Sequence, residues 1–297
     1  MDAQEAVTVL QLVSSATVLC YASLLDWRTR RVGNVFWMVL SAAAIALLVA
    51  RVIVDEAPLE YLLVLVPVLV VLADVYGPSG ESGALSRLLP IISYAVAILL
   101  TVYLAYLWAD DRYFAHLLTV PVTMILVVLL YMVDIVRGGA DAKALIALSI
   151  MFPFYPHIGS LPLIAADNSF AEILFPFAFV VLVNSAIIVA FTPIAFVVRN
   201  LAAGEFALPY ALVGYKLDAG DIKTRQVWLM ERMEDGVHRR YTRPRRDESL
   251  SEEVDKLVSA GHQRIWVTPK VPFIIPMTIA LVFTAVVGNV LVIIMGF

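Results

Sequence analysis

Two aspartates, Asp26 and Asp141, lie where apolar runs meet short polar stretches. Asp26 opens the stretch DWRTRRVGN at the end of the first apolar run, and Asp141 stands in GGADAK at the head of a later run. Charged side chains in or beside membrane segments are costly and tend to be functional. Two carboxylates held close together do not both ionise easily, so one keeps its proton while the other stays charged. Such a pair can take a proton from water and give one to a peptide carbonyl.

Each aspartate also has a purely structural interpretation. Asp26 is followed by three arginines within five residues. In this interpretation its role is only to neutralise one of them. Asp141 can act as a helix cap at the positive end of the helix dipole. Asn34 is a natural cap for the second apolar run. Gly138 and Gly139 allow backbone conformations closed to other residues, which would let the chain approach a neighbouring helix or a substrate.

Two further acids lie near the ends of membrane segments, and both have structural interpretations. Asp74 near the end of the third apolar run fits the lipid headgroup region, and Asp134 fits a pair with Arg137. Cys20 is the only cysteine, which excludes an internal disulfide and a zinc site built on several cysteines. No H-E-x-x-H motif occurs, and we expect no metal and no cofactor. The histidines are not expected to cluster; they are His116, His157, His238 and His262.

The composition indicates a polytopic membrane protein. The 297 residues are 61% hydrophobic and only 15% charged, whereas ordinary soluble domains are about 25% charged. A bilayer-spanning helix needs about 20 apolar residues. Six runs reach or approach that length: 6–25, 35–54, 59–76, 88–108, 117–136 and 173–198. Another run closes the chain at 272–295, and a short one from Asp141 to Met151 precedes a proline-rich loop. We therefore expect an all-α fold of about eight transmembrane helices.

The basic residues predict the orientation, because they concentrate in cytosolic loops. With the N-terminus outside, all but Arg51 and Arg112 of the 21 lysines and arginines fall in cytosolic segments. Asp26 and Asp141 then share the cytosolic face. The basic segment 199–270 falls on the same face if the short run after Asp141 crosses the membrane, so the charge alternation supports that crossing. The predicted domains are a transmembrane core at 1–198 with about seven spans, a cytosolic segment at 199–270 and a final transmembrane helix at 271–297.

The segment 199–270 carries 13 basic and 11 acidic residues. Its stretch 249–261 predicts an amphipathic helix with Ser249 as N-cap and Gly261 at the C-terminal cap. The stretch 221–233 is a second helical candidate. Anionic lipid headgroups would attract the basic stretch 238–246, but the small net charge of the segment argues against nucleic acid as a partner.

At its two aspartate motifs the sequence resembles the type IV prepilin peptidases, in particular the archaeal prepilin and preflagellin (prearchaellin) peptidases. These are membrane aspartic proteases of the GxGD type. Their first motif is an aspartate at the end of span one, a basic stretch and an ending like (I/V)PN, and here Gly33 replaces the proline before Asn34. In the second motif Gly138 matches the first glycine, Ala140 replaces the second, and Asp141 is the aspartate.

The resemblance implies a catalytic pair, Asp26 and Asp141. The motif residues that would support them are Gly138, Gly139, Ala140, Lys143 and Asn34. The implied substrates are membrane-inserted pilin-like or archaellin precursors, whose short basic leader is removed at the cytosolic face. Two extra spans lie between the aspartates compared with the six-span archaeal pattern. The cysteine-rich loop of the bacterial enzymes is missing, so no methyltransferase activity is implied.

Two other classes of function remain open from the sequence. The proline-broken stretch 152–166 fits a secondary transporter, because discontinuous helices mark transport sites. Against a transporter, the acids gather at one membrane face and no inverted repeat is visible. The long segment 199–270 would also suit a non-catalytic membrane scaffold.

Overall fold

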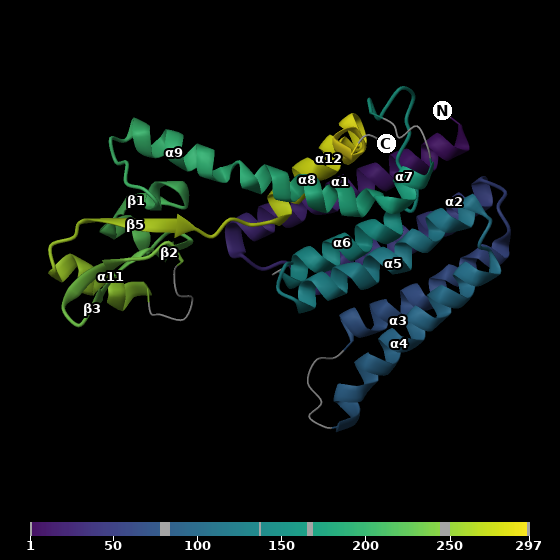
Figure 1. Ribbon diagram of the computed structural model, residues 1–297, viewed down its shortest axis with the longest axis horizontal. Coiled ribbons are helices and arrows are strands. Elements are labelled where there is room, and N and C mark those ends of the chain that lie inside the picture. The colour runs from purple at the N-terminus through teal and green to yellow at the C-terminus, as the bar shows by residue number, and fades with distance from the viewer. Residues whose placement is uncertain (1, 78–83, 137, 165–168, 244–249, 296–297) are drawn as a thin grey trace. The chain divides into compact units, whose positions relative to one another are not determined.

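The computed structural model describes residues 2–77, 84–136, 138–164, 169–243 and 250–295. This part of the chain is mostly helical and forms two compact units (Figure 1). Unit 1 consists of Met1–Ala186 and Pro272–Phe297, and unit 2 is Ile187–Val271.

Six helical segments among the described residues are long and apolar enough to cross a membrane. They are α1 (Ala3–Thr29), α2 (Asn34–Val54), the 3-10 helix η1 (Leu59–Val64) continued by α3 (Leu65–Tyr76), α4 (Ala84–Leu107), α5 (Arg112–Met132), and α8 (Phe177–Ala190) continued by α9 (Thr192–Ala202). They coincide with the six long apolar runs of the sequence. The chain therefore has the helices of a multi-pass membrane protein.

Of the two remaining expected spans, the first is a short helix as predicted, and the second is shorter than the sequence predicts. Helix α6 (Gly139–Met151) has 13 residues, too few to cross the hydrocarbon layer, which takes about 20. Helix α12 (Ile274–Val287) has 14 residues and ends at Gly288, whose φ of 102° breaks the helix expected over 272–295. A short helix, α13 (Val290–Met295), follows it, and another, α7 (Ser169–Leu174), precedes α8. The described residues thus hold fewer long helices than the eight expected.

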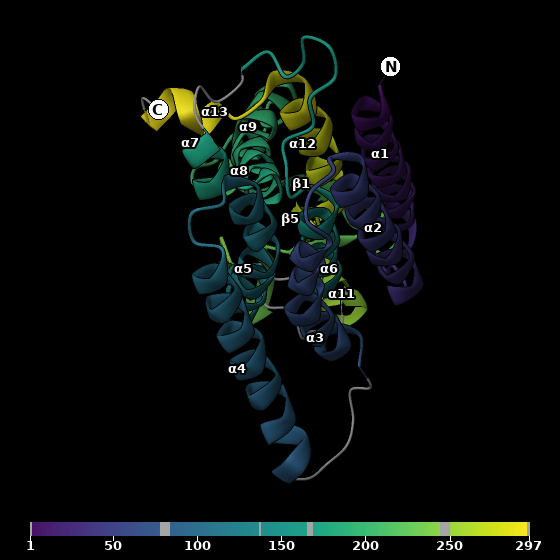
Figure 2. The same ribbon diagram turned by 90° about the vertical axis from the view of Figure 1, so that its right-hand side faces the viewer.

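Helix α6 lies inside unit 1, in contact with α1, α2 and α5 (Figure 2). Every residue from Ala144 to Met151 is buried, as expected for a short helix that is apolar on all sides. Beyond it the chain returns through an extended loop, where the backbone N–H groups of Leu163 and Ile164 donate to the carbonyls of Val286 and Val287 at 2.9 and 2.8 Å. The proline-rich stretch is thereby tied to the end of α12.

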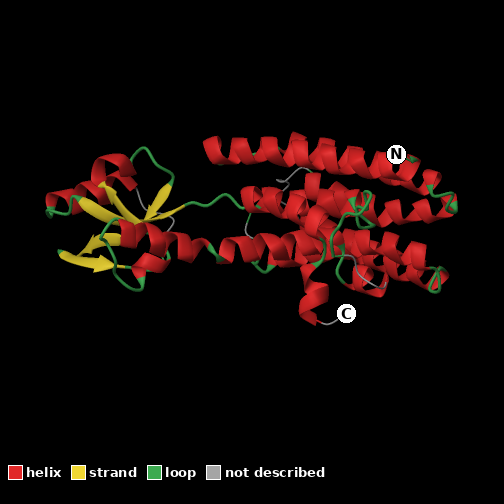
Figure 3. Ribbon diagram, turned by 90° about the horizontal axis from the view of Figure 1, so that it is seen from above, coloured by secondary structure: helices red, strands yellow, loops and turns green. Residues whose placement is uncertain are grey.

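Unit 2 is not all-α, which corrects the expected fold class. It holds a three-stranded antiparallel sheet in the order β1-β5-β2 and a hairpin of β3 with β4 (Figure 3). The strands are β1 (Tyr215–Asp218), β2 (Val227–Leu229), β3 (Glu231–Glu234), β4 (Val237–Arg240) and β5 (Arg264–Pro269). The helix predicted over 221–233 is wrong, because β2 and β3 occupy its second half and only the end of the short α10 (Ala219–Ile222) overlaps its start.

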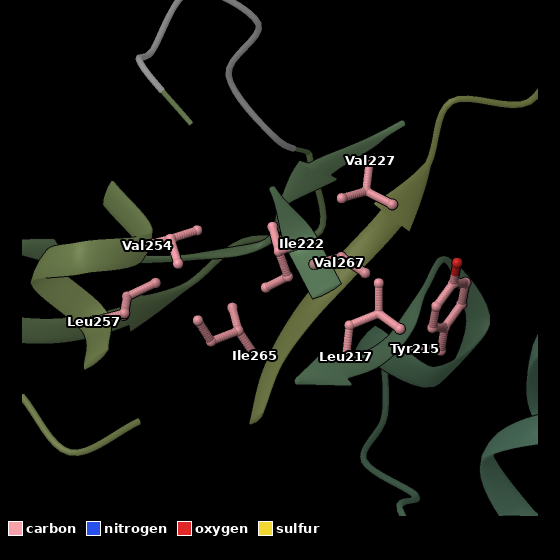
Figure 4. Packing of buried hydrophobic residues seen from close by; sticks show 8 residues of the cluster. All are labelled: Tyr215, Leu217, Ile222, Val227, Val254, Leu257, Ile265 and Val267. Carbon is pink, nitrogen blue, oxygen red and sulfur yellow. The ribbon is translucent and has the colours of Figure 1, made fainter. Parts of the chain in front are cut away.

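The helix predicted over 249–261 is confirmed as α11 (Leu250–Ser259). Gly261 follows its end with a φ of 90°, as a glycine after a helix C-cap does; Ser249 lies outside the described residues. Val254 and Leu257 of α11 point into the core of unit 2, which the sheet completes (Figure 4). The core consists of Tyr215, Leu217, Ile222, Val227, Val254, Leu257, Ile265 and Val267.

Candidate functional site

Asp26 lies in the last turn of α1 and is half-buried. The helix ends four residues later because Arg30 adopts the left-handed conformation, φ 57°, with its N–H donating to the carbonyl of Asp26 at 3.1 Å. Helix α2 then begins after Gly33. The turn between α1 and α2 therefore places Asp26 at the end of this helical hairpin.

Asp141 lies in the first turn of α6, and it is not the N-cap. Gly138 is the N-cap residue, with Gly139 and Ala140 as the first two residues of the helix, so the capping interpretation of Asp141 is wrong. The carboxylate nevertheless faces the positive end of the helix dipole. Asp141 is half-buried, and none of the described residues gives its carboxylate a hydrogen bond or an ion pair.

Gly138 is required for a different reason from the one the sequence suggested. Its backbone angles, φ −93° and ψ 121°, are open to any residue. A side chain at this position would instead collide with the Asp141 carboxylate, because a Cβ atom there meets Oδ2. At Gly139 the nearest atom to an added Cβ is the Tyr131 hydroxyl at 3.7 Å, an ordinary contact. The first motif glycine makes room for the Asp141 carboxylate, and the neighbouring glycine has no such role.

A hydrogen bond joins the two motif segments, which lie more than 100 residues apart in the sequence. Lys143 Nζ donates to Asn34 Oδ1 at 2.8 Å, and the same ammonium lies 5.7 Å from the centre of the Tyr76 ring. Asn34 is the first residue of α2, and Gly33 is the N-cap, so Asn34 does not cap the helix as expected. The side chain of Asn34 instead holds Lys143, two residues beyond Asp141.

The electrostatics of Asp141 reflect its surroundings at the head of α6. Burial, and second the negative charge of Asp26, raise the pKa of Asp141 from its ordinary value to about 7. The charge of Asp26 is therefore near enough to act on Asp141. At neutral pH such a pair holds one proton between two carboxyl groups, which suits acid–base chemistry on one substrate bond.

The two other acids of this region have different positions. Asp74 accepts a hydrogen bond from the Tyr94 hydroxyl at 2.7 Å and lines a cavity of about 380 Å³, together with Gly139, Ala142 and Lys143 of α6. Asp134 is exposed in the turn after α5, with a φ of 60°. Arg137, its expected partner, lies outside the described residues.

A second polar cluster, at the other end of α5, was missed in the sequence. Glu172 of α7 approaches His116 of α5 at 3.4 Å and His157 of the proline-rich loop at 3.9 Å. The rings of His238 and His262 in unit 2 stack with their centres 4.0 Å apart. The prediction that the histidines stay apart is wrong. These residues are distant in the sequence and are brought together only by folding, so no local sequence pattern indicates the contacts.

Comparison with known proteins gives two similarities. Residues 207–290 match the family model described as Archaeal Peptidase A24 C-terminus Type II. The chain is also 25% identical over 161 residues to a preflagellin peptidase of Methanococcus maripaludis, an alignment that covers 51% of this chain and 64% of the relative. The chain thus spans less than two thirds of that relative's length. The family-model match does not include the two aspartate segments. Both similarities are to archaeal peptidases, one through the family model and one through the name of the relative.

Proposed function

We propose that the chain is a membrane aspartic endopeptidase in which Asp26 and Asp141 share one proton. It removes the short basic leader from pilin-like or archaellin precursors inserted in the same membrane. The observation that carries this proposal is the action of the Asp26 charge on Asp141, which raises the pKa of the Asp141 carboxyl.

The chemistry follows from the two protonation states. The charged carboxylate, Asp26, takes a proton from a water molecule, whose oxygen then attacks the scissile carbonyl carbon. Asp141 gives its proton to the carbonyl oxygen, and a tetrahedral diol forms. The C–N bond then breaks as the amine nitrogen takes the proton held by Asp26, while a diol hydroxyl returns its proton to Asp141. Both carboxyl groups end as they began, and no metal or cofactor takes part.

The surroundings of Asp141 support an extended peptide as the substrate. Gly138, Gly139 and Ala140 leave the backbone at the head of α6 almost without side chains, so a second chain can approach Asp141 closely. Lys143 and Asn34 hold the two aspartate segments together from the neighbouring surface.

The charge distribution supports a cytosolic site. An outside N-terminus places both aspartate segments in the cytosol, and it places the basic segment 199–270 there when α6 and the loop that follows it cross the membrane together. The transmembrane core would then carry the chemistry, and the segment 199–270 would face the cytosol. Cleavage would occur just before the apolar helix of the precursor.

Proteoliposomes that contain the full chain and a pilin-like or archaellin-like precursor test this function. Leader removal is followed on a gel. Asp26→Asn and Asp141→Asn should each lower the rate at least about a hundredfold, because an amide neither shares the proton nor acts as a base.

Asp134→Asn and Asp74→Asn are the matched controls, since both remove an acid from the same region and should leave cleavage near the wild-type rate. Normal cleavage by either Asp26→Asn or Asp141→Asn contradicts the pair. An inactive Asp134→Asn would show that the second acid is misassigned. A transporter or a scaffold predicts no cleavage by the wild-type chain.

A further inference from the structure

In unit 2, a loop after α9 has one side packed against the unit and another side exposed. This 203–213 loop includes the 3-10 helix η2 (Tyr210–Leu212). Its inner residues pack against Met230 and Trp266 of the same unit, and they are Ala207, Tyr210, Ala211 and Val213. Phe206, Leu208 and Leu212 point outward, with 47, 60 and 40% of their surfaces exposed. One side of the loop thus belongs to a small core, and the other side presents three large apolar side chains.

The loop is fixed in this conformation from beneath. Asn200 of α9 is buried and donates from Nδ2 to the carbonyls of Ala211 and Gly214 at 3.2 and 2.8 Å. The N–H of Glu205 donates back to the carbonyl of Asn200 at 2.8 Å. The outward position of the apolar side chains is therefore part of the fold of unit 2.

The loop directly follows α9 in the chain, and one face of that helix is also exposed and apolar. Its residues are Ile194, Val198 and Leu201, and the exposed N-cap residue Phe191 precedes them. The segment Phe177–Ala202 that contains α9 is long and apolar enough to cross a membrane. Its 26 residues measure about 39 Å at 1.5 Å per residue, about 9 Å more than the hydrocarbon layer, so the end of α9 reaches the headgroup region.

Charges around the loop are also compatible with a lipid surface. Its single acid, Glu205, lies 3.0 Å from Arg264 Nη1 and 3.9 Å from Lys216 Nζ. Arg199 of α9 packs over the ring of Tyr215, 3.5 Å from its centre. The loop therefore has no uncompensated negative charge to repel anionic headgroups, and a rigid, exposed apolar surface of this kind marks an interaction site.

We propose that the 203–213 loop is a membrane anchor, whose residues Phe206, Leu208 and Leu212 insert into the bilayer interface beside the end of α9. Unit 2 is then held at the membrane surface through contacts of its own, in addition to its covalent connections. The bilayer is the occupant because the loop directly follows a candidate membrane helix whose own apolar face is exposed, and short amphipathic segments bind at this depth.

Spin labels on the full chain in nanodiscs test the anchor by a readout that does not depend on peptidase activity. In a Cys20→Ser background, single cysteines replace Leu208, Leu212 and, as the matched control, Val237, an equally exposed apolar residue on β4. Oxygen concentrates in the apolar layer and a nickel chelate in water. The ratio of oxygen to nickel accessibility should be several-fold higher at positions 208 and 212 than at position 237, in both zwitterionic and anionic lipid.

Three outcomes overturn the anchor. Labels at positions 208 and 212 that match position 237 would place the loop in water. Labels shielded from both reagents would place it against protein, such as a second copy of the chain. Insertion only in anionic lipid would assign membrane attachment to the basic residues of unit 2. A Phe206→Ser and Leu208→Ser double change should raise nickel access at position 212, and unchanged access there would also contradict insertion.

Discussion

The two ends of the helical hairpin α1–α2 differ in the number of hydrogen-bond donors that their acidic side chains receive. At the end where α1 begins, Asp55 accepts hydrogen bonds from Arg51 Nε at 2.7 Å, Gln4 Nε2 at 2.8 Å and the Tyr113 hydroxyl at 3.0 Å. At the other end, no described residue gives the carboxylate of Asp26 or Asp141 a hydrogen bond or an ion pair. A carboxylate with several donors stabilises the fold, whereas a half-buried acid beside a second acid costs stability and keeps a proton available.

This contrast distinguishes an acid that stabilises the fold from the pair of acids to which the proposed function assigns the chemistry. The Asp55 carboxylate is saturated, in the sense that both of its oxygens already accept hydrogen bonds. A substrate could therefore not bind it without breaking contacts that stabilise the fold. The Asp141 carboxylate lacks such donors among the described residues, and burial, with the negative charge of Asp26 second, raises its pKa to about 7. Functional sites commonly trade stability for reactivity in this way.

The largest expected effect is on stability at the saturated end. Asp55→Ala removes the ion-pair partner of Arg51, whose guanidinium lies partly buried. The change should lower the free energy of unfolding by about 3 kcal/mol, as for other broken buried pairs. Asp141→Asn should leave the unfolding free energy unchanged or increase it, because it removes a repelled charge. Steric-trap or denaturant unfolding in bicelles measures both. A larger loss of stability in Asp141→Asn than in Asp55→Ala would break the comparison.

The next effect sharpens the reactive end. Gly138→Ala places a Cβ atom against Asp141 Oδ2 and must move the carboxylate. A displacement of the Asp141 carboxylate by about 1 Å should lower kcat for leader removal about a hundredfold. Gly139→Ala, where the added Cβ meets only the Tyr131 hydroxyl, is the control and should stay within about twofold, since alanine also favours a helix over glycine. Equal losses in the two variants would remove the steric role assigned to Gly138.

A pH effect of about tenfold per unit should follow from the pKa of Asp141. Below about pH 7 the Asp141 carboxyl keeps its proton while Asp26 is charged, and above it that proton is lost. The cleavage rate should therefore fall as pH rises through about 7. In Asp26→Asn the charge that raises the pKa of Asp141 is gone, so infrared titration of its carboxyl group should show a lower pKa than in the wild type. An unchanged pKa would mean that the two acids do not interact.

The sequence predicted the long helices well, because hydropathy over about 20 residues is a local property. The alternation of basic segments also predicts that Asp26 and Asp141 lie on one side of the membrane. The same local logic failed in unit 2. Strands β2 and β3 have three and four residues, too few for an alternating pattern, and β2 forms by pairing with β5, about 40 residues further along the chain.

The finer features of the site depend on three-dimensional contacts that no local pattern encodes. The requirement for glycine at position 138 comes from the carboxylate of Asp141 and leaves the backbone angles ordinary. The expectation that Asn34 caps its helix was reasonable by residue type, but its side chain binds a lysine from α6. Of the saturated end, only the Arg51–Asp55 pair has a sequence signal, the spacing of four residues on one helix.

The smallest expected effect concerns that lysine. Lys143→Met removes the hydrogen bond to Asn34 and should lower kcat about fivefold, the equivalent of about 1 kcal/mol for one exposed polar contact. Lys143→Arg keeps a donor and should recover part of the rate. Because Lys143 acts on Asn34, Asn34→Ala and Lys143→Met should not add in the double variant, leaving a coupling energy of about 1 kcal/mol. The alkaline fall in rate should stay at the same pH in all of these variants, since each keeps Asp26, the charge that acts on Asp141. Additive losses, or a shifted pH profile, would show that Lys143 affects Asp141 through its charge and that the bond to Asn34 does not position the reactive end.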